Sequence, residues 1–180
     1  MSKARQKNYF DTCTIIDAID YTSRYYTNVR QALKQVKGDC VFSEYMEVEL
    51  KGVLRKSRFS GIKDKLLSEY AHLKRALQAK WIPNDRGIMN LHRIARWLQK
   101  EVRSLCRGGY PKFPDIVHIG ICGLEDITNI LSEDWHIYGR SIQGIPFVEI
   151  VKRVISRNVC NVSNPQHVYT TRRGYLRREV

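Results

Sequence analysis

Short apolar runs alternate with helical patterns along most of this chain, and this alternation limits the folds open to it. The runs are residues 7–11, 40–43, 129–131 and 144–148. Between them, apolar residues recur at helical spacing over 13–20, 24–37, 43–57, 62–80, 87–107, 115–124 and 149–157. Strands that alternate with helices are typical of βαβ units. The sequence therefore predicts a helix-rich α/β domain built on a parallel sheet.

The predicted domain occupies residues 1–158, and a basic tail follows over residues 159–180. Its last part, TTRRGYLRREV, shows no apolar period, so we expect the tail to be flexible. No apolar run approaches the ~20 residues that span a bilayer. The basic N-terminus leads into a strand and not into the apolar core of a signal peptide, so we expect a cytoplasmic protein without a membrane partner.

The net charge narrows the class of partner. The chain has 31 basic and 18 acidic residues, which gives a formal charge of +13. An excess of this size favours a polyanionic partner, above all nucleic acid. A merely solvated surface remains the alternative, because residues 51–65 and 93–107 spread lysine and arginine along helices.

Four acidic residues stand at or near the ends of predicted strands: Asp11, Glu49, Asp115 and Asp134. Each also has an ordinary explanation. Asp11 and Asp115 suit helix N-termini, and Asp134 suits a turn. Glu49 falls on the buried face of its helix, where a carboxylate is costly unless it is paired or bound to a cation.

We expect the four acids to lie close together, because the carboxyl ends of the strands in a parallel sheet meet at one edge. Two unit charges about 5 Å apart repel by about 3 kcal/mol at an effective dielectric of about 20. Such a cluster calls for protonation or for a cation, and hard oxygen ligands suit Mg²⁺ or Mn²⁺. Carboxylates, a divalent metal and a basic surface together indicate phosphodiester chemistry by metal-activated water.

Three segments resemble the PIN-domain nucleases. FDTCTIID is similar to the opening strand of that family, and SEYMEVEL to its Ser-x5-Glu-Leu helix with Ser43 and Glu49 at the patterned positions. PDIVHIGICGLEDITNILSEDWHIY is similar to its longest signature, with Asp115 opening a helix and Ser132, Asp134 and His136 after a strand. The resemblance covers roughly residues 7–150, and only the order and spacing of all the motifs make it specific.

The resemblance implies a three-layer α/β/α sandwich around four to five short parallel strands. It also implies Mg²⁺- or Mn²⁺-dependent cleavage of RNA by Asp11, Glu49, Asp115 and Asp134. Many small members are toxins of toxin–antitoxin pairs, so a protein antitoxin and a homodimer are expected partners besides RNA. Cys13 stands where the family has Asn or Ser, which predicts a weaker hydrogen bond there.

Other residues have two readings each. Thr12 and Ser132 could hydrogen-bond the metal ligands, or be ordinary helix-start and turn hydroxyls. His136 could touch RNA or position a carboxylate, or be an ordinary surface histidine. His118 on the apolar helix is interpreted as a packed core residue. Candidate phosphate contacts are Arg140, Arg172 and Arg173.

The predicted function is therefore that of a metal-dependent endoribonuclease. The toxin of a toxin–antitoxin pair is the specific form that the resemblance suggests. Two rivals stay open at the sequence level. One is a catalytically silent RNA-binding or assembly module on the same scaffold, which Cys13 and the basic tail leave open. The other is a structure-specific DNA nuclease, which would use a similar acid cluster.

Overall fold

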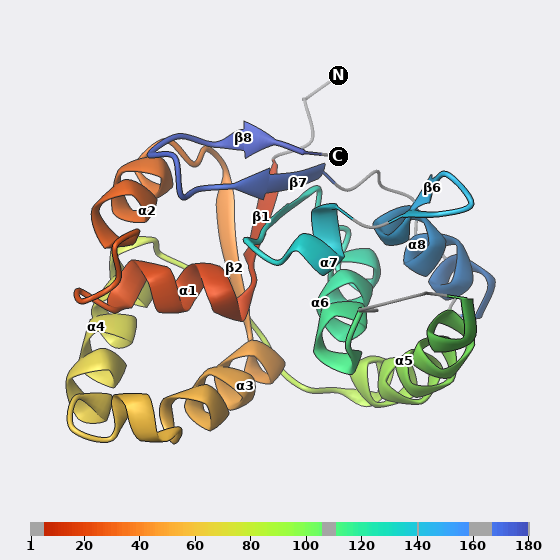
Figure 1. Ribbon diagram of the computed structural model, residues 1–180, viewed down its shortest axis with the longest axis horizontal. Helices are drawn as coiled ribbons and strands as arrows, with labels where there is room; N and C mark the ends of the chain where they lie inside the picture. Colours follow the sequence, from red (N-terminus) through yellow and green to blue (C-terminus); the bar gives the residue numbers. More distant parts are fainter. Residues whose placement is uncertain (1–5, 106–110, 140, 159–166, 180) are drawn as a thin grey trace.

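The computed structural model describes residues 6–105, 111–139, 141–158 and 167–179. A six-stranded sheet runs through its centre, in the order β3-β2-β1-β4-β7-β8 (Figure 1). The strands are β1 (Lys7–Phe10), β2 (Asp39–Ser43), β3 (Lys80–Ile82), β4 (Asn129–Leu131), β7 (His167–Thr170) and β8 (Arg177–Arg178). The first five pair in parallel, and β8 closes the edge antiparallel to β7.

Helices cover both faces of this sheet. On one side lie α1 (Thr12–Ile19), α2 (Tyr26–Leu33), α3 (Glu44–Leu54) and α4 (Lys63–Ala76). On the other lie α5 (Arg86–Leu105), α6 (Phe113–Leu124), α7 (Trp135–Tyr138) and α8 (Phe147–Asn158) (Figure 1). Helix α1 packs against α2, α3 and α4, and α6 packs against α5, α7 and α8. The predicted three-layer α/β/α sandwich is thus confirmed.

Strand β1 sets the position of the functional edge. It pairs with β2 through Tyr9 and Val41, and with β4 through Phe10 and Leu131. Because the three strands run parallel in this register, the residues that follow them emerge at one edge of the sheet. Tyr9 and Phe10 are fully buried, so the strand that carries this edge is anchored in the core.

The prediction of a fourth strand of the parallel sheet over residues 144–148 is wrong. Ile145–Pro146 forms β6, which pairs with β5 (Ser141–Ile142) in a separate hairpin, and Phe147 already begins α8. Gln143 and Gly144 both have positive φ, 52° and 79°, which suits a two-residue hairpin turn. Pro146 has no N–H to donate to a longer ladder.

Strand β3 takes the place of part of a predicted helix. The helix expected over 62–80 ends at Ala76, and Gln78 has a φ of 47°. Lys80–Ile82 then pairs with β2, with Lys80 opposite Val41. Three residues are too few to show a period of their own, so only pairing with β2 identifies this strand.

The C-terminal segment also differs from its prediction. Residues 167–179, expected in a flexible tail, supply β7 and β8 of the main sheet, with Val168 opposite Ile130. The Arg172 Nε atom lies 2.7 Å from Asp17 Oδ2, and the Thr171 hydroxyl donates to Glu133 at 2.8 Å. These partners are distant in sequence, so no local pattern indicates them. Residues 159–166 and 180 of the predicted tail lie outside the described residues.

Helices α5 and α6 meet closely at Gly120. A Cβ atom at this position would lie 2.3 Å from Leu91 Cδ1, so the absence of a side chain lets the buried Leu91 pack against the α6 backbone. Among the residues that the structure describes, no helix combines the length and hydrophobicity needed to cross a bilayer.

Candidate metal centre

Asp11 is the first residue after β1, and it caps α1. Its Oδ1 accepts a hydrogen bond from the Thr12 backbone N–H at 2.6 Å. Its Oδ2 accepts from the Ser132 hydroxyl at 2.6 Å and from the Cys13 thiol at 3.1 Å. The side chain is therefore both a helix cap and a carboxylate held in place at the sheet edge, with 5% of its surface exposed.

Cys13 supplies a hydrogen bond at the position where Asn or Ser was expected. Burial, followed by the charge of Asp11, raises the pKa of the Cys13 thiol well above its usual range. The sulfur therefore keeps its proton and donates to Asp11 Oδ2. It also accepts from the Glu133 backbone N–H at 3.2 Å, so the substitution preserves a contact to the carboxylate.

Glu49 reaches Asp11 from α3. Its Oε2 accepts from the Thr12 hydroxyl, and it lies 2.7 Å from His118 Nε2. The same imidazole nitrogen is 3.3 Å from Asp11 Oδ1. Burial acts to raise the pKa of Glu49, but the hydrogen bond and charge of His118 and the bond from Thr12 outweigh it, so the pKa is lowered. Glu49 is thus a carboxylate held ionised.

His118 is the functional residue that the sequence analysis missed. It is buried, as a packed residue should be, yet both ring nitrogens have polar partners. Its Nδ1 lies 2.8 Å from the Tyr9 hydroxyl, which lies 2.7 Å from Ser43 Oγ. One signal was available: His118 follows Asp115 by three residues, which places both on one face of the helix.

The charges around His118 decide its protonation. Burial alone would lower its pKa, but the charges of Asp11, Glu49 and Asp115 and the hydrogen bond to Glu49 raise it. A charged imidazole donates from both nitrogens, so it can bond Glu49 on one side and Tyr9 on the other. His118 therefore balances part of the negative charge at this edge.

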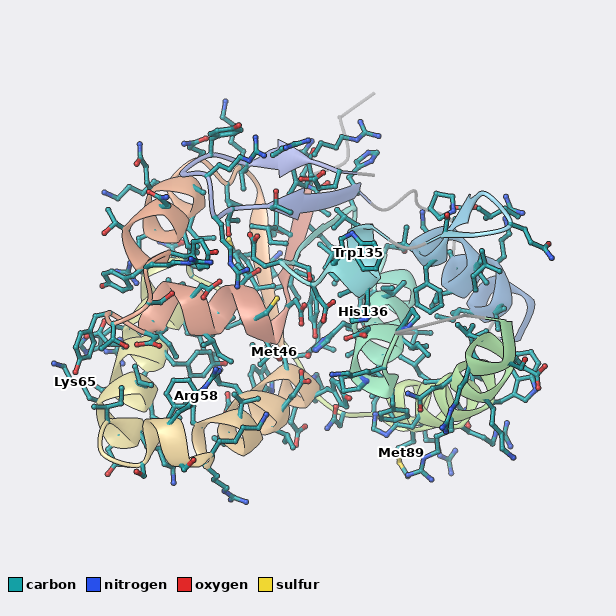
Figure 2. The ribbon with its side chains drawn as sticks, in the orientation of Figure 1. Met46, Arg58, Lys65, Met89, Trp135 and His136 are labelled. Carbon is teal, nitrogen blue, oxygen red and sulfur yellow. The ribbon has the colours of Figure 1, made fainter. Side chains whose placement is uncertain are left out.

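Asp115 and Asp134 form a second group with His136. Asp115 Oδ2 accepts from the Lys112 backbone N–H at 2.6 Å, at the start of α6. Asp134 caps α7, and its Oδ1 accepts from the His136 backbone N–H at 2.7 Å and lies 2.8 Å from His136 Nδ1. His136, labelled in Figure 2, therefore lies within hydrogen-bond distance of the Asp134 carboxylate, and its role there stays a prediction.

The two groups adjoin. Asp11, Glu49 and His118 each offer a ligand atom within 4.8 Å of the others, and so do Asp115, Asp134 and His136. Burial, then the charge of Asp134 and next that of Asp11, raise the pKa of Asp115 to about 7 against a hydrogen bond from Lys112 that lowers it. Besides burial, which is the largest cause, the raised pKa thus reflects the negative charges of Asp134 and Asp11.

The predicted ligands fit a hard divalent cation. They are carboxylate oxygens, those of Asp11 and Asp115 buried and those of Glu49 and Asp134 half-buried, and they come from four elements that meet at one sheet edge. Oxygen-rich sites of this kind suit Mg²⁺ or Mn²⁺. The negative charge that helps to raise the pKa of Asp115 is the charge that such a cation would neutralise.

The predicted phosphate-contacting arginines do not gather at this centre. Arg172 lies beside it, where Asp17 holds it at 2.7 Å and Tyr25 lies under its guanidinium at 4.2 Å. Arg173 is exposed on the same segment. Arg140 lies outside the described residues. A nucleic-acid role for these arginines stays a prediction.

No protein-family model matches the sequence, and no curated protein matches it. Solved structures do match. VapC20 of Mycobacterium tuberculosis, a toxin that cleaves the sarcin–ricin loop, superposes with a TM-score of 0.55 at 11% identity, over 71% of this chain and 90% of that chain. FitAcB of Neisseria gonorrhoeae gives 0.52 at 14% identity, over 88% and 96%. VapBC2 of Rickettsia felis, bound to a DNA fragment from its promoter, gives 0.51 at 15%, over 78% and 96%.

These matches define the class of fold. The chain has the α/β/α fold of the PIN-domain nucleases, as its motifs predicted. Within that class, the structures that it resembles include a VapC toxin and components of VapBC and FitAB complexes.

Proposed function

We propose that this protein is an endoribonuclease that depends on Mg²⁺ or Mn²⁺. The observation that carries the proposal is the meeting of Asp11, Glu49, Asp115 and Asp134 at one sheet edge, in two adjoining groups of possible ligands. The cleavage of the sarcin–ricin loop named for VapC20, which shares the fold, supports RNA as the substrate.

The four carboxylates would hold the ion. When bound, Mg²⁺ or Mn²⁺ supplies Lewis acidity toward a phosphate oxygen and lowers the pKa of water. The hydroxyls of Thr12 and Ser132 keep Glu49 and Asp11 in position by donating to their oxygens.

Two histidines complete the arrangement. His118 donates to Glu49 from within the core, and His136 holds Asp134 through Oδ1. Both would limit the rotation of these carboxylates. Ligands whose orientation is fixed by further hydrogen bonds bind a metal more tightly and in a defined geometry.

The test is cleavage of a single-stranded RNA with Mg²⁺, with Mn²⁺ and with EDTA, by the wild type and by Asp11→Asn. Asparagine keeps an oxygen that can accept from Thr12 N–H but removes the charge. We expect cleavage to stop in EDTA and to fall at least 100-fold in the variant. Asp64→Asn, an exposed carboxylate on α4, is the matched control. Activity that survives both EDTA and Asp11→Asn refutes the proposal.

The same assay separates the rivals. Binding of RNA without turnover would assign the silent RNA-binding module. Faster digestion of flapped or single-stranded DNA than of RNA would assign a DNA nuclease. The hydrogen bond from Cys13 to Asp11 favours an active nuclease over the silent module. Although Cys13 departs from the family pattern, its thiol still donates to the Asp11 carboxylate.

We also propose that the described elements form a single nuclease domain with a protein antitoxin as partner, as the pairing named for VapBC2 suggests. A homodimer is the second proposed assembly. Light scattering on the purified chain tests the dimer, and a single monomer mass at micromolar concentration would exclude it.

A further inference from the structure

The solvent face of α5 carries a stripe of positive charge. Its basic residues are Arg86, Arg93, Arg96, Lys100 and Arg103, all exposed. At ~100° per residue these five fall within an arc of about 100°, and the single acid of the helix, Glu101, falls outside it. We call these five residues the α5 stripe. Met89 lies in the same arc, and Figure 2 shows it directed away from α6 and the sheet.

Three of the five cations in the α5 stripe have no carboxylate partner among the described residues. Arg93, Arg96 and Lys100 form no ion pair with any residue that the structure describes. Exposed cations elsewhere do find carboxylates: Lys51 lies 2.7 Å from Glu47, and Arg153 lies 3.2 Å from Glu149. Arg93, Arg96 and Lys100 are therefore available to bind anions.

Aromatic rings join this stripe to the candidate metal centre. The Arg96 guanidinium lies 5.9 Å from the centroid of Phe113, which lies 5.5 Å from that of His92. His92 lies 5.3 Å from Tyr45, and Tyr45 lies 5.3 Å from His118. The chain of rings thus ends at the imidazole that bonds Glu49.

The rings are also accessible. Tyr45, His92 and Phe113 are each only half-buried. The Nε2 atom of His92 is itself buried and has no hydrogen-bond partner among the described residues, so the accessible part of this side chain is elsewhere on the ring. Rings beside a row of cations form the combination that binds a single nucleic-acid strand, because bases stack on the rings while phosphates contact the cations.

We propose that the α5 stripe and the rings of Tyr45, His92 and Phe113 form the track that holds single-stranded RNA as it enters the metal centre. This inference rests on the proposed ribonuclease function and names the surface that binds its substrate. The track would position the strand without reading its sequence, because phosphate contacts and stacking do not depend on base identity.

The test measures binding of a fluorescein-labelled single-stranded RNA in EDTA, by anisotropy, from 50 to 200 mM salt. The variant is Arg93→Glu/Arg96→Glu/Lys100→Glu. The control is Lys34→Glu/Lys37→Glu/Arg75→Glu, which changes the net charge equally at exposed cations on and near α2 and α4. Circular dichroism checks that both remain folded.

The expected result follows from counterion release. Losing three phosphate contacts should reduce the slope of log affinity against log salt by about 2, so the affinity ratio of wild type to variant narrows roughly 20-fold between 50 and 200 mM salt. The control should keep the wild-type slope. His92→Ala should weaken binding about tenfold without changing the slope, because stacking carries no charge.

The outcomes separate this inference from the proposed function. Equal slopes for the α5 variant and the control overturn the track, even if the wild type cleaves RNA with Mg²⁺. An altered oligomeric state with unchanged RNA affinity would assign α5 to a protein interface and also overturn it. Binding is measured without metal. A smaller slope of log affinity against log salt for the α5 variant therefore supports the track, whether or not the protein cleaves RNA.

Discussion

Replacing Asp115 by asparagine should make the metal-free protein more stable while it abolishes cleavage. Burial and the charges of Asp134 and Asp11 raise the pKa of Asp115 to about 7. An aspartate in an unfolded chain has a pKa of about 3.9. The folded state therefore holds this proton more tightly, and stability is lost as the pH rises from about 4 to 7.

The magnitude follows from this difference. The raised pKa of Asp115 should lower the free energy of unfolding by about 4 kcal/mol at pH 8, where the folded protein holds it ionised, and by about 1.5 kcal/mol at pH 5, where folding takes up a proton. Asparagine removes the charge, and its oxygen can still accept from the Lys112 N–H that bonds Asp115 Oδ2 at 2.6 Å. In a chain of this size the gain corresponds to a rise in Tm of roughly 10 °C at pH 8 and roughly 4 °C at pH 5.

Thermal unfolding in EDTA at the two pH values measures this effect. Glu101→Gln, an exposed carboxylate on α5, is the control and should shift Tm by no more than about 1 °C at either pH. Added Mg²⁺ should raise the Tm of the wild type, since it binds the folded state, and should raise that of Asp115→Asn much less. A gain that is equal at pH 5 and pH 8 would refute the reasoning from charge.

Three further changes have defined outcomes. His118→Leu should lower the free energy of unfolding by about 3–5 kcal/mol in urea, because two carboxylates lose their buried partner; a loss below about 1 kcal/mol would contradict this. Gly120→Ala should cost about 1–3 kcal/mol by overpacking against Leu91, and the double variant with Leu91→Ala should lose less than the sum of the two single losses. Arg172→Ala should speed hydrogen exchange of the β7 amides, because it removes the ion pair with Asp17; unchanged exchange would show that β7 holds without it.

The sheet illustrates where prediction from sequence succeeds. Residues 7–11, 40–43 and 129–131 were predicted as strands from short apolar runs, and all three pair in the centre of the sheet. Three strands of this sheet were missed: β3, β7 and the two-residue β8. Strands β3 and β7 are no shorter than β4, but their own residues do not show apolar runs. Lys80–Ile82 and His167–Thr170 form strands because they pair with β2 and β4, which are distant in the chain.

The candidate metal centre was likewise only partly predictable from the sequence. Acids at strand ends can be found from the sequence, because parallel strands bring their carboxyl ends to one edge. The partners of those acids cannot, since hydrogen bonds such as Glu49 to His118 join residues that are 69 positions apart. The sequence therefore indicates a core residue at His118, and only the tertiary structure places its imidazole between the carboxylates of Asp11 and Glu49.

The sequence by itself determined the alternation of strands and helices, the excess of positive charge and the order of the four acids, because each is a property of residue types and local spacing. The tertiary structure decided which strands complete the sheet, how His118 and Cys13 bond the acids, and where Arg93, Arg96 and Lys100 lie relative to the centre. These features depend on contacts between side chains that form only when distant segments pack. The energy of a buried charge is set by the groups that contact it.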